Sequence, residues 1–182
     1  MPTIDEINAF DRPAFIRALG GVFENSPWIA EDTFDRRPFR DASLLHSEMC
    51  AALRRAPAGR QLDLIRAHPD LAGRLAKAGD LTAESAREQA HAGLDRLPPA
   101  ELAEFGRRNR AYRERFGFPF VICARLNDRG AILQAMEIRL RNSPAEERAA
   151  ALSEIEKIAW LRLQDLIRAP APGTGDAGGP GS

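Results

Sequence analysis

The chain has 182 residues, of which 44% are hydrophobic and 29% are charged, as in ordinary soluble globular proteins. Its 26 basic and 26 acidic residues cancel, so the composition gives no sign of a nucleic-acid partner. The two cysteines belong to no Cys-x-x-Cys or Cys/His ligand pattern, and no apolar run approaches the ~18 residues of a membrane span. The N-terminus also lacks the pattern of a signal peptide. We therefore expect a soluble, cytoplasmic protein with no disulfide framework, no structural metal and no membrane contact.

In the first half of the chain, hydrophobic residues recur at helical spacing. Thr3 and Glu6 have the spacing of a capping box. Ser26 and Pro27 are typical of a helix cap followed by proline at the first helical position. The pattern predicts helices at about 4–10, 12–20, from 27 onward, 41–55 and 58–67.

The second half predicts four more helices, at about 82–91, 99–116, 131–141 and 144–167. The strongest helix start in the sequence is the segment 143–146 (SPAE), which has an N-cap serine, a proline and a capping acid in order. The segment 120–123 (FVIC) resembles a strand, but a single strand has no partner, so we expect buried irregular backbone. The fold class is therefore predicted to be all-α, a single-domain bundle of roughly eight helices over residues 1–168 with no significant sheet. The Pro/Gly-rich segment 169–182 is expected to be a disordered tail.

His68 stands between a predicted helix and a proline. Pro69 disfavours helical backbone angles at His68, so the helix should end there. The unpaired carbonyls and the dipole of a helix C-terminus favour a protonated imidazole, which could act as a general acid. Local physics alone also allows a simpler interpretation, a helix stop with a solvated histidine.

Three separated motifs identify a possible family. They are residues 67–73 (AHPDLAG), 84–89 (ESAREQ) and 116–122 (FGFPFVI), and a looser match follows at 139–142 (RLRN). In this combination and order the sequence resembles the 2-oxo-4-hydroxy-4-carboxy-5-ureidoimidazoline (OHCU) decarboxylases. The resemblance implies a carboxy-lyase that converts OHCU to (S)-allantoin and CO2 in the breakdown of urate.

The resemblance also implies roles for individual residues. His68 is implied as the catalytic imidazole and proton donor, and Glu88 as a second catalytic group that orients it or favours its charged form. Arg139 is implied to recognise a carboxylate or carbonyl of the substrate, with Arg141 as a rival for that role. The implied substrate-binding residues are Pro69, Ser85, Glu88, Gln89, Phe120, Val121, Ile122, Cys123, Ala124 and Arg139.

The implied substrate explains why the chain needs no visible cofactor motif. A C=N bond in the imidazoline ring, next to the carboxyl-bearing carbon, can accept the electron pair that decarboxylation leaves behind. We therefore expect no cofactor and no metal, a small-molecule substrate as the main partner, and a homodimer as the candidate assembly. Two alternatives stay open. Ser85, Glu88 and Gln89 share one helix face and could simply be solvated, and the whole chain could be a helical interaction module that keeps only a relic of the motifs.

Overall fold

The computed structural model describes residues 1–72 and 81–168. These residues form nine α-helices and two short 3-10 helices, and none of them lies in a strand. The prediction of an all-α fold is confirmed. Gly73 and the segment 169–182, expected to be a tail, lie outside the described residues. No helix in the described part is both long enough and apolar enough to cross a membrane.

The helices follow the predicted order. The first half contains α1 (Ile4–Ala9), α2 (Arg12–Leu19), α3 (Trp28–Thr33), η1 (Phe34–Arg36), α4 (Ala42–Arg55) and α5 (Ala58–Ala67). The second half contains α7 (Ala83–His91), α8 (Pro99–Phe116), η2 (Ala124–Leu126), α9 (Arg129–Arg139) and α10 (Pro144–Leu166).

The helix caps test the sequence patterns directly. Both predicted capping boxes are present, at Thr3 in front of α1 and at Ser143 in front of α10. The predicted cap by Ser26 is wrong, because Pro27 occupies the N-cap position of α3 and no side chain caps it. The start of α3 relies instead on a backbone bond, in which the Ile29 amide donates to the Ser26 carbonyl at 3.2 Å.

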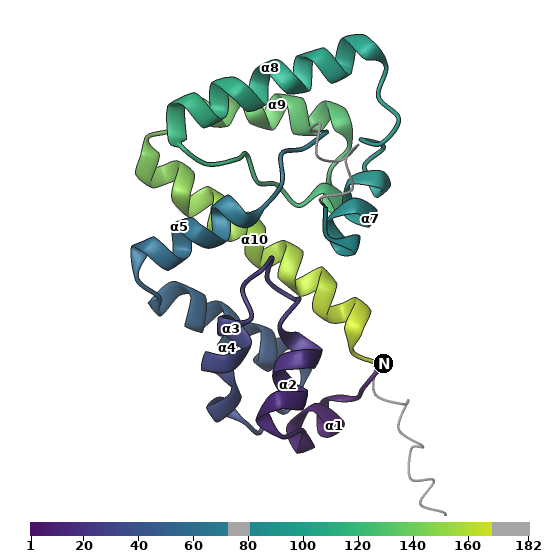
Figure 1. Cartoon of the computed structure of the whole chain (residues 1–182), viewed down its shortest axis with the longest axis vertical. Coiled ribbons are helices and arrows are strands. Elements are labelled where there is room, and N and C mark those ends of the chain that lie inside the picture. The colour runs from purple at the N-terminus through teal and green to yellow at the C-terminus, as the bar shows by residue number, and fades with distance from the viewer. Residues whose placement is uncertain (73–80, 169–182) are drawn as a thin grey trace, which may run out of the picture.

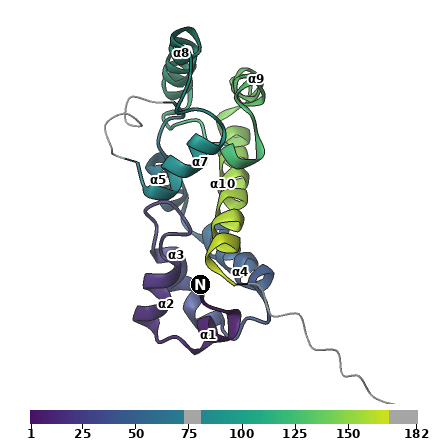
Figure 2. The ribbon, with the colours of Figure 1, turned by 90° about the vertical axis from the view of Figure 1, so that its right-hand side faces the viewer.

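The molecule is elongated, and α10 connects its two ends (Figure 1). Helices α1–α4 gather at one end and α8 and α9 lie at the other, as the turned view also shows (Figure 2). Helix α10 packs against both α4 and α5, and α7 packs against η2. At the end of α10, the Arg168 amide donates to the Pro2 carbonyl at 2.9 Å, which joins this helix to the N-terminus.

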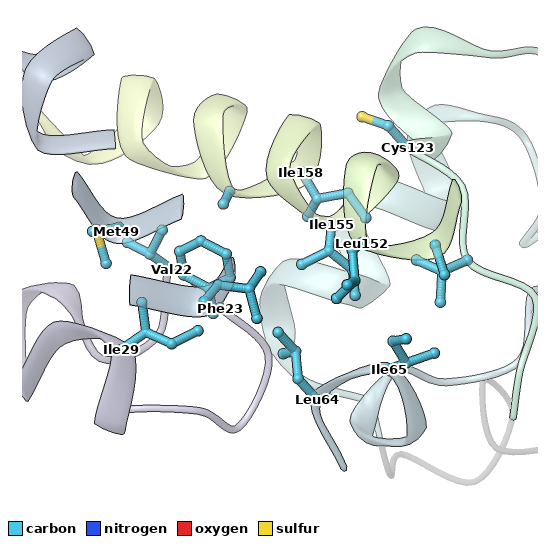
Figure 3. Close-up of a cluster of buried hydrophobic side chains, with 14 of the residues drawn as sticks. Val22, Phe23, Ile29, Met49, Leu64, Ile65, Cys123, Leu152, Ile155 and Ile158 are labelled. Atoms are coloured by element: carbon cyan, nitrogen blue, oxygen red, sulfur yellow. The ribbon is translucent and has the colours of Figure 1, made fainter. Parts of the chain in front are cut away.

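One apolar cluster joins the N-terminal helices to α5 and α10 (Figure 3). Burial of each such side chain contributes roughly 1.5–3 kcal/mol to the stability of the fold. The cluster therefore fixes the positions of α5 and α10 relative to the helices that precede them. Its labelled members are Val22, Phe23, Ile29, Met49, Leu64, Ile65, Cys123, Leu152, Ile155 and Ile158.

The segment between α8 and η2 is buried backbone without regular structure, as predicted. Gly117 ends α8 at φ +75°, a left-handed conformation that favours glycine. Side chains then satisfy part of the buried backbone: Arg139 donates to the Val121 carbonyl at 2.8 Å, and Glu154 accepts from the Cys123 amide at 2.9 Å. These bonds hold residues 120–124 beside α7 and the end of α5.

Candidate active site

A small cavity of about 30 Å³ lies where the end of α5, helix α7 and residues 120–124 meet. Nine of the eleven predicted site residues line it, and Cys123 and Arg139 do not. Two further lining residues, Leu71 and Ile158, were not predicted. The lining residues are His68, Pro69, Leu71, Ser85, Glu88, Gln89, Phe120, Val121, Ile122, Ala124 and Ile158.

His68 is the C-cap of α5, and its backbone is extended (ψ 138°), as the following proline requires. Its imidazole is buried, and Nδ1 lies 2.9 Å from the carbonyl oxygen of Leu64, one turn back in the same helix. A carbonyl can only accept a hydrogen bond, so Nδ1 carries the proton. In the neutral ring Nε2 is therefore the unprotonated nitrogen.

The burial of His68 works against the protonated form that a helix end favours. Burial lowers the pKa of His68 to about 4, and the nearby Arg162 acts in the same direction. The Leu64 hydrogen bond and the charge of Glu24 oppose this shift without overcoming it. A helix C-terminus stabilises an imidazolium by at most about 2 kcal/mol, and the cost of removing the charged ring from water outweighs that effect.

Glu88 is held by an arginine that lies outside the sequence motifs. Arg162 of α10 binds it with two hydrogen bonds, from Nε to Oε1 at 2.7 Å and from Nη2 to Oε2 at 2.8 Å. Within the described residues no hydrogen bond joins Glu88 to His68, so the Leu64 carbonyl orients the imidazole in place of the expected Glu88. Burial alone would lower the pKa of Arg162, but Glu88 and Glu24 together raise it.

Ser85 and Gln89 are buried on the same face of α7 as Glu88. The Ser85 hydroxyl donates to Glu24 at 3.0 Å and accepts from Arg162 at 3.2 Å. Gln89 accepts from the Ala72 amide at 3.0 Å, so it ties the chain that follows His68 to α7. The solvated-face interpretation of these residues is therefore wrong.

Arg139 lies behind the cavity wall. Its Nε donates to Glu147 at 2.9 Å, its Nη1 donates to the Val121 carbonyl at 2.8 Å, and its guanidinium lies 4.4 Å from the Phe120 ring centroid. The rival Arg141 is 78% exposed and lies 3.7 Å from Glu137. In this structure neither guanidinium lines the cavity.

A profile of the OHCU decarboxylase family matches residues 8–164. The chain belongs to this family. It is 43% identical over 169 residues to the 2-oxo-4-hydroxy-4-carboxy-5-ureidoimidazoline decarboxylase of Amia calva, covering 93% of this chain and 97% of that protein. It is 42% identical over 172 residues to the decarboxylase of the same name from Halalkalicoccus jeotgali, covering 94% of this chain and 95% of that protein.

The crystal structure of (S)-allantoin synthase has the same fold, with a TM-score of 0.74 and 28% sequence identity. The match covers 91% of this chain and 54% of that longer chain. The fold of that protein therefore extends over nearly the whole of this chain.

Two buried charges of this OHCU decarboxylase family member, Glu24 and Arg162, were missed from sequence. Arg162 is 7% exposed and Glu24 is 2% exposed. A signal for Arg162 was present, because it follows Ile155 and Ile158 at helical spacing on the apolar face of α10. Glu24 gave no comparable signal, since it lies between helices in a segment without periodicity. In the described residues, no group of three His, Cys, Asp or Glu side chains is placed to hold a metal ion.

Proposed function

We propose that this chain decarboxylates OHCU to (S)-allantoin and CO2 in urate breakdown, with His68 as the proton-transfer group and no cofactor. The observation that carries the proposal is the convergence of His68, Ser85 and Glu88 on one cavity from two separate helices. A cytoplasmic location and a homodimer stay predictions.

The hydrogen bonds already made in the site define what it offers a ligand. Each oxygen of Glu88 receives one bond from Arg162 and keeps a lone pair. The Ser85 hydroxyl donates to Glu24 and accepts from Arg162, so toward a ligand it can only accept, through its remaining lone pair. With the neutral Nε2 of His68, the site presents three acceptors, which suit the ring and ureido N–H groups of OHCU.

A second wall of the cavity offers donors. Val121 and Ile122 line it, and their backbone amides have no acceptor in the described part of the chain. The carbonyl oxygens of an imidazoline and its ureido group are suitable acceptors for such amides. Acceptors on α7 and donors on residues 120–124 would hold the planar ligand between them.

The substrate carries a hydroxyl and a carboxyl on one ring carbon. Loss of CO2 breaks the bond to the carboxyl carbon and leaves its electron pair to the adjacent C=N, whose nitrogen takes a proton from water. The enol that remains must lose its hydroxyl proton and gain a proton on the neighbouring carbon to become the carbonyl compound allantoin. The neutral Nε2 of His68 can take the first proton as a base and return it to carbon as an acid. A single imidazole on one face of the ring would make the product stereospecific.

The test supplies OHCU made freshly from urate with uricase and the hydrolase that follows it. The absorbance of OHCU should decay faster than its spontaneous decay, and circular dichroism should report (S)-allantoin. Replacement of His68 by Asn should lower the rate by at least about 10²-fold, whereas replacement of the exposed His91 by Asn should not. Exhaustive chelation should leave the wild-type rate unchanged.

Three outcomes would contradict parts of this proposal. A wild-type rate equal to spontaneous decay would remove the activity. A near-normal rate for His68→Asn would remove the histidine from the chemistry. A loss on chelation that added zinc restores would show that the reaction needs a metal.

A further inference from the structure

Glu24 is a buried carboxylate outside the cavity whose two oxygens are both engaged. It lies between α2 and α3, in the N-terminal half of the molecule, and is 2% exposed. Oε1 accepts from the Thr82 hydroxyl at 2.8 Å. Oε2 accepts from the Ser85 hydroxyl at 3.0 Å and lies 2.8 Å from Nη1 of Arg162. Glu24 therefore connects the N-terminal helices to both α7 and α10.

We propose that Glu24 is a positioning residue for the decarboxylation: it fixes the Arg162 guanidinium, and through it the Glu88 carboxylate that lines the cavity. This inference rests on the proposed function. The guanidinium is held at both ends, with Glu24 on Nη1 and Glu88 on Nε and Nη2. Without Glu24, Nη1 of Arg162 loses its carboxylate partner, and the planar guanidinium can rotate. The Glu88 carboxylate, which is bonded to the same guanidinium, would then change its orientation as well.

Glu24 also determines what Ser85 offers to a ligand. Because the Ser85 hydroxyl donates to Glu24, its lone pair is available to the cavity. If Glu24 could not accept, the hydroxyl proton would be free to turn toward Glu88. The segment that contains α1–α4 thus affects the cavity although it contributes no lining residue.

The charge of Glu24 supports the same role. Three charged groups lie around the imidazole of His68: Glu24 from the segment before α3, Arg162 from α10 and Glu88 across the cavity on α7. Glu24 raises the pKa of His68 and Arg162 lowers it, whereas burial is the largest influence. A neutral residue at position 24 would therefore make the imidazole harder to protonate.

The first test replaces Glu24 with Gln, which keeps the shape of the side chain but removes the charge that holds Nη1 of Arg162 and replaces one acceptor oxygen with an NH2 group. We expect kcat to fall about 10-fold with KM changed less than about 3-fold, because the lost effect concerns the orientation of catalytic groups. Glu24→Asp keeps the charge but withdraws the carboxylate by one methylene, and it should lose activity as well. The matched control is Glu156→Gln, which also removes a carboxylate that binds an arginine with two bonds (Arg54, 2.6 and 2.7 Å) but lies away from the cavity. The control should retain full kcat.

A double-mutant cycle then tests whether Glu24 acts through Glu88. In a Glu88→Gln background, Glu24→Gln should cost less than about 3-fold, because the group it positions is already gone. Equal losses in both backgrounds would overturn the proposal, as would a fully active Glu24→Asp.

A third readout does not depend on activity. In the free protein, the ¹⁵N-resolved Nε–H signal of Arg162 reports its bond to Glu88. We expect this signal to move toward that of an unbound arginine in Glu24→Gln and Glu24→Asp but not in Glu156→Gln. An unchanged signal would overturn the positioning role even if the wild type proved inactive on OHCU, and inactivity itself would overturn only the proposed function.

Discussion

Two buried arginine–carboxylate clusters lie toward the two ends of α10, and they serve the cavity differently. Near its N-terminus, Glu147 of α10 receives Arg139 and is also bonded by Asn142 at 2.8 Å and by Tyr112. Nearer its C-terminus, Arg162 of α10 binds Glu24 and Glu88. The first cluster reaches the cavity through two residues of its wall, by a bond to the Val121 carbonyl and by contact with the Phe120 ring. The second reaches it through the side chain of Glu88, which lines the cavity.

The difference shows that the guanidinium of a buried arginine near a cavity need not bind the ligand. Arg139 contacts Glu147 and two wall residues, Val121 and Phe120, so its role is to hold the wall in place. Burial lowers the pKa of Arg139 to about 10, a shift that the charge of Glu154 opposes, and burial raises the pKa of Glu147. We therefore expect the Arg139 cluster to govern stability and the Arg162 cluster to govern turnover as well.

Replacement of Arg162 by Met should have the largest effect. It removes the cation between two buried carboxylates, and breaking such a pair costs about 3–5 kcal/mol. It also releases Glu88, so we expect the rate per folded molecule to fall by at least about 10²-fold. Urea unfolding and initial rates at matched folded concentration measure the two effects separately. A variant that is destabilised but fully active would place Arg162 outside the catalytic apparatus.

Replacement of Arg139 by Met should match the first variant in stability but not in activity. It leaves Glu147 buried and uncompensated, at a similar cost of about 3–5 kcal/mol. The rate per folded molecule should fall less than about 10-fold, because His68, Ser85 and Glu88 keep their partners. Equal losses of activity in the two arginine variants would contradict the distinction between the Arg139 cluster and the Arg162 cluster. Arg139 would then act on the substrate itself.

The pH dependence of stability isolates the buried imidazole beside the Arg162 cluster. Burial lowers the pKa of His68 from 6.5 to about 4. As the pH falls, the unfolded chain takes up this proton first, so the contribution is complete above about pH 6.5 and is lost as the pH falls toward 4. The loss amounts to about 3 kcal/mol. In a plot of unfolding free energy against pH, His68→Asn should flatten the part between pH 4 and 6.5. Arg139→Met should lower the whole curve and leave its slope unchanged. The measurement is urea unfolding from pH 4 to 7, and a parallel curve for His68→Asn would show that the ring is not buried as a neutral group.

The sequence predicted the helices well because their determinants are local. Caps such as Thr3 and Ser143, the proline after His68 and Gly117 after α8 each act within one turn, so the helix bounds and the position of His68 followed from them. The motifs also brought most of the cavity lining together through the family resemblance. Partner choice is not local: Glu88 binds a residue 74 positions away, and Glu24 binds Ser85 61 positions away. The ionisation of His68 depends on burial by the whole fold, so local helix-end physics gave the wrong sign.

The smallest effect should come from a third arginine–carboxylate pair on α10, which differs from the other two in exposure. Asp165 is 63% exposed and binds Arg125, which is 28% exposed, through two bonds at 2.5 and 3.2 Å. Its geometry is as favourable as that of the buried pairs, but water and salt screen it, and such pairs contribute only about 0–1 kcal/mol. Asp165→Asn should therefore lower the unfolding free energy by at most about 0.5 kcal/mol and leave kcat unchanged, and added salt should remove even this difference. Urea unfolding at low and high salt measures it against Arg139→Met. A loss of several kcal/mol in unfolding free energy that persists in high salt would show that burial does not determine how much these three pairs contribute to stability. The difference between the Arg139 and Arg162 clusters would then need another cause.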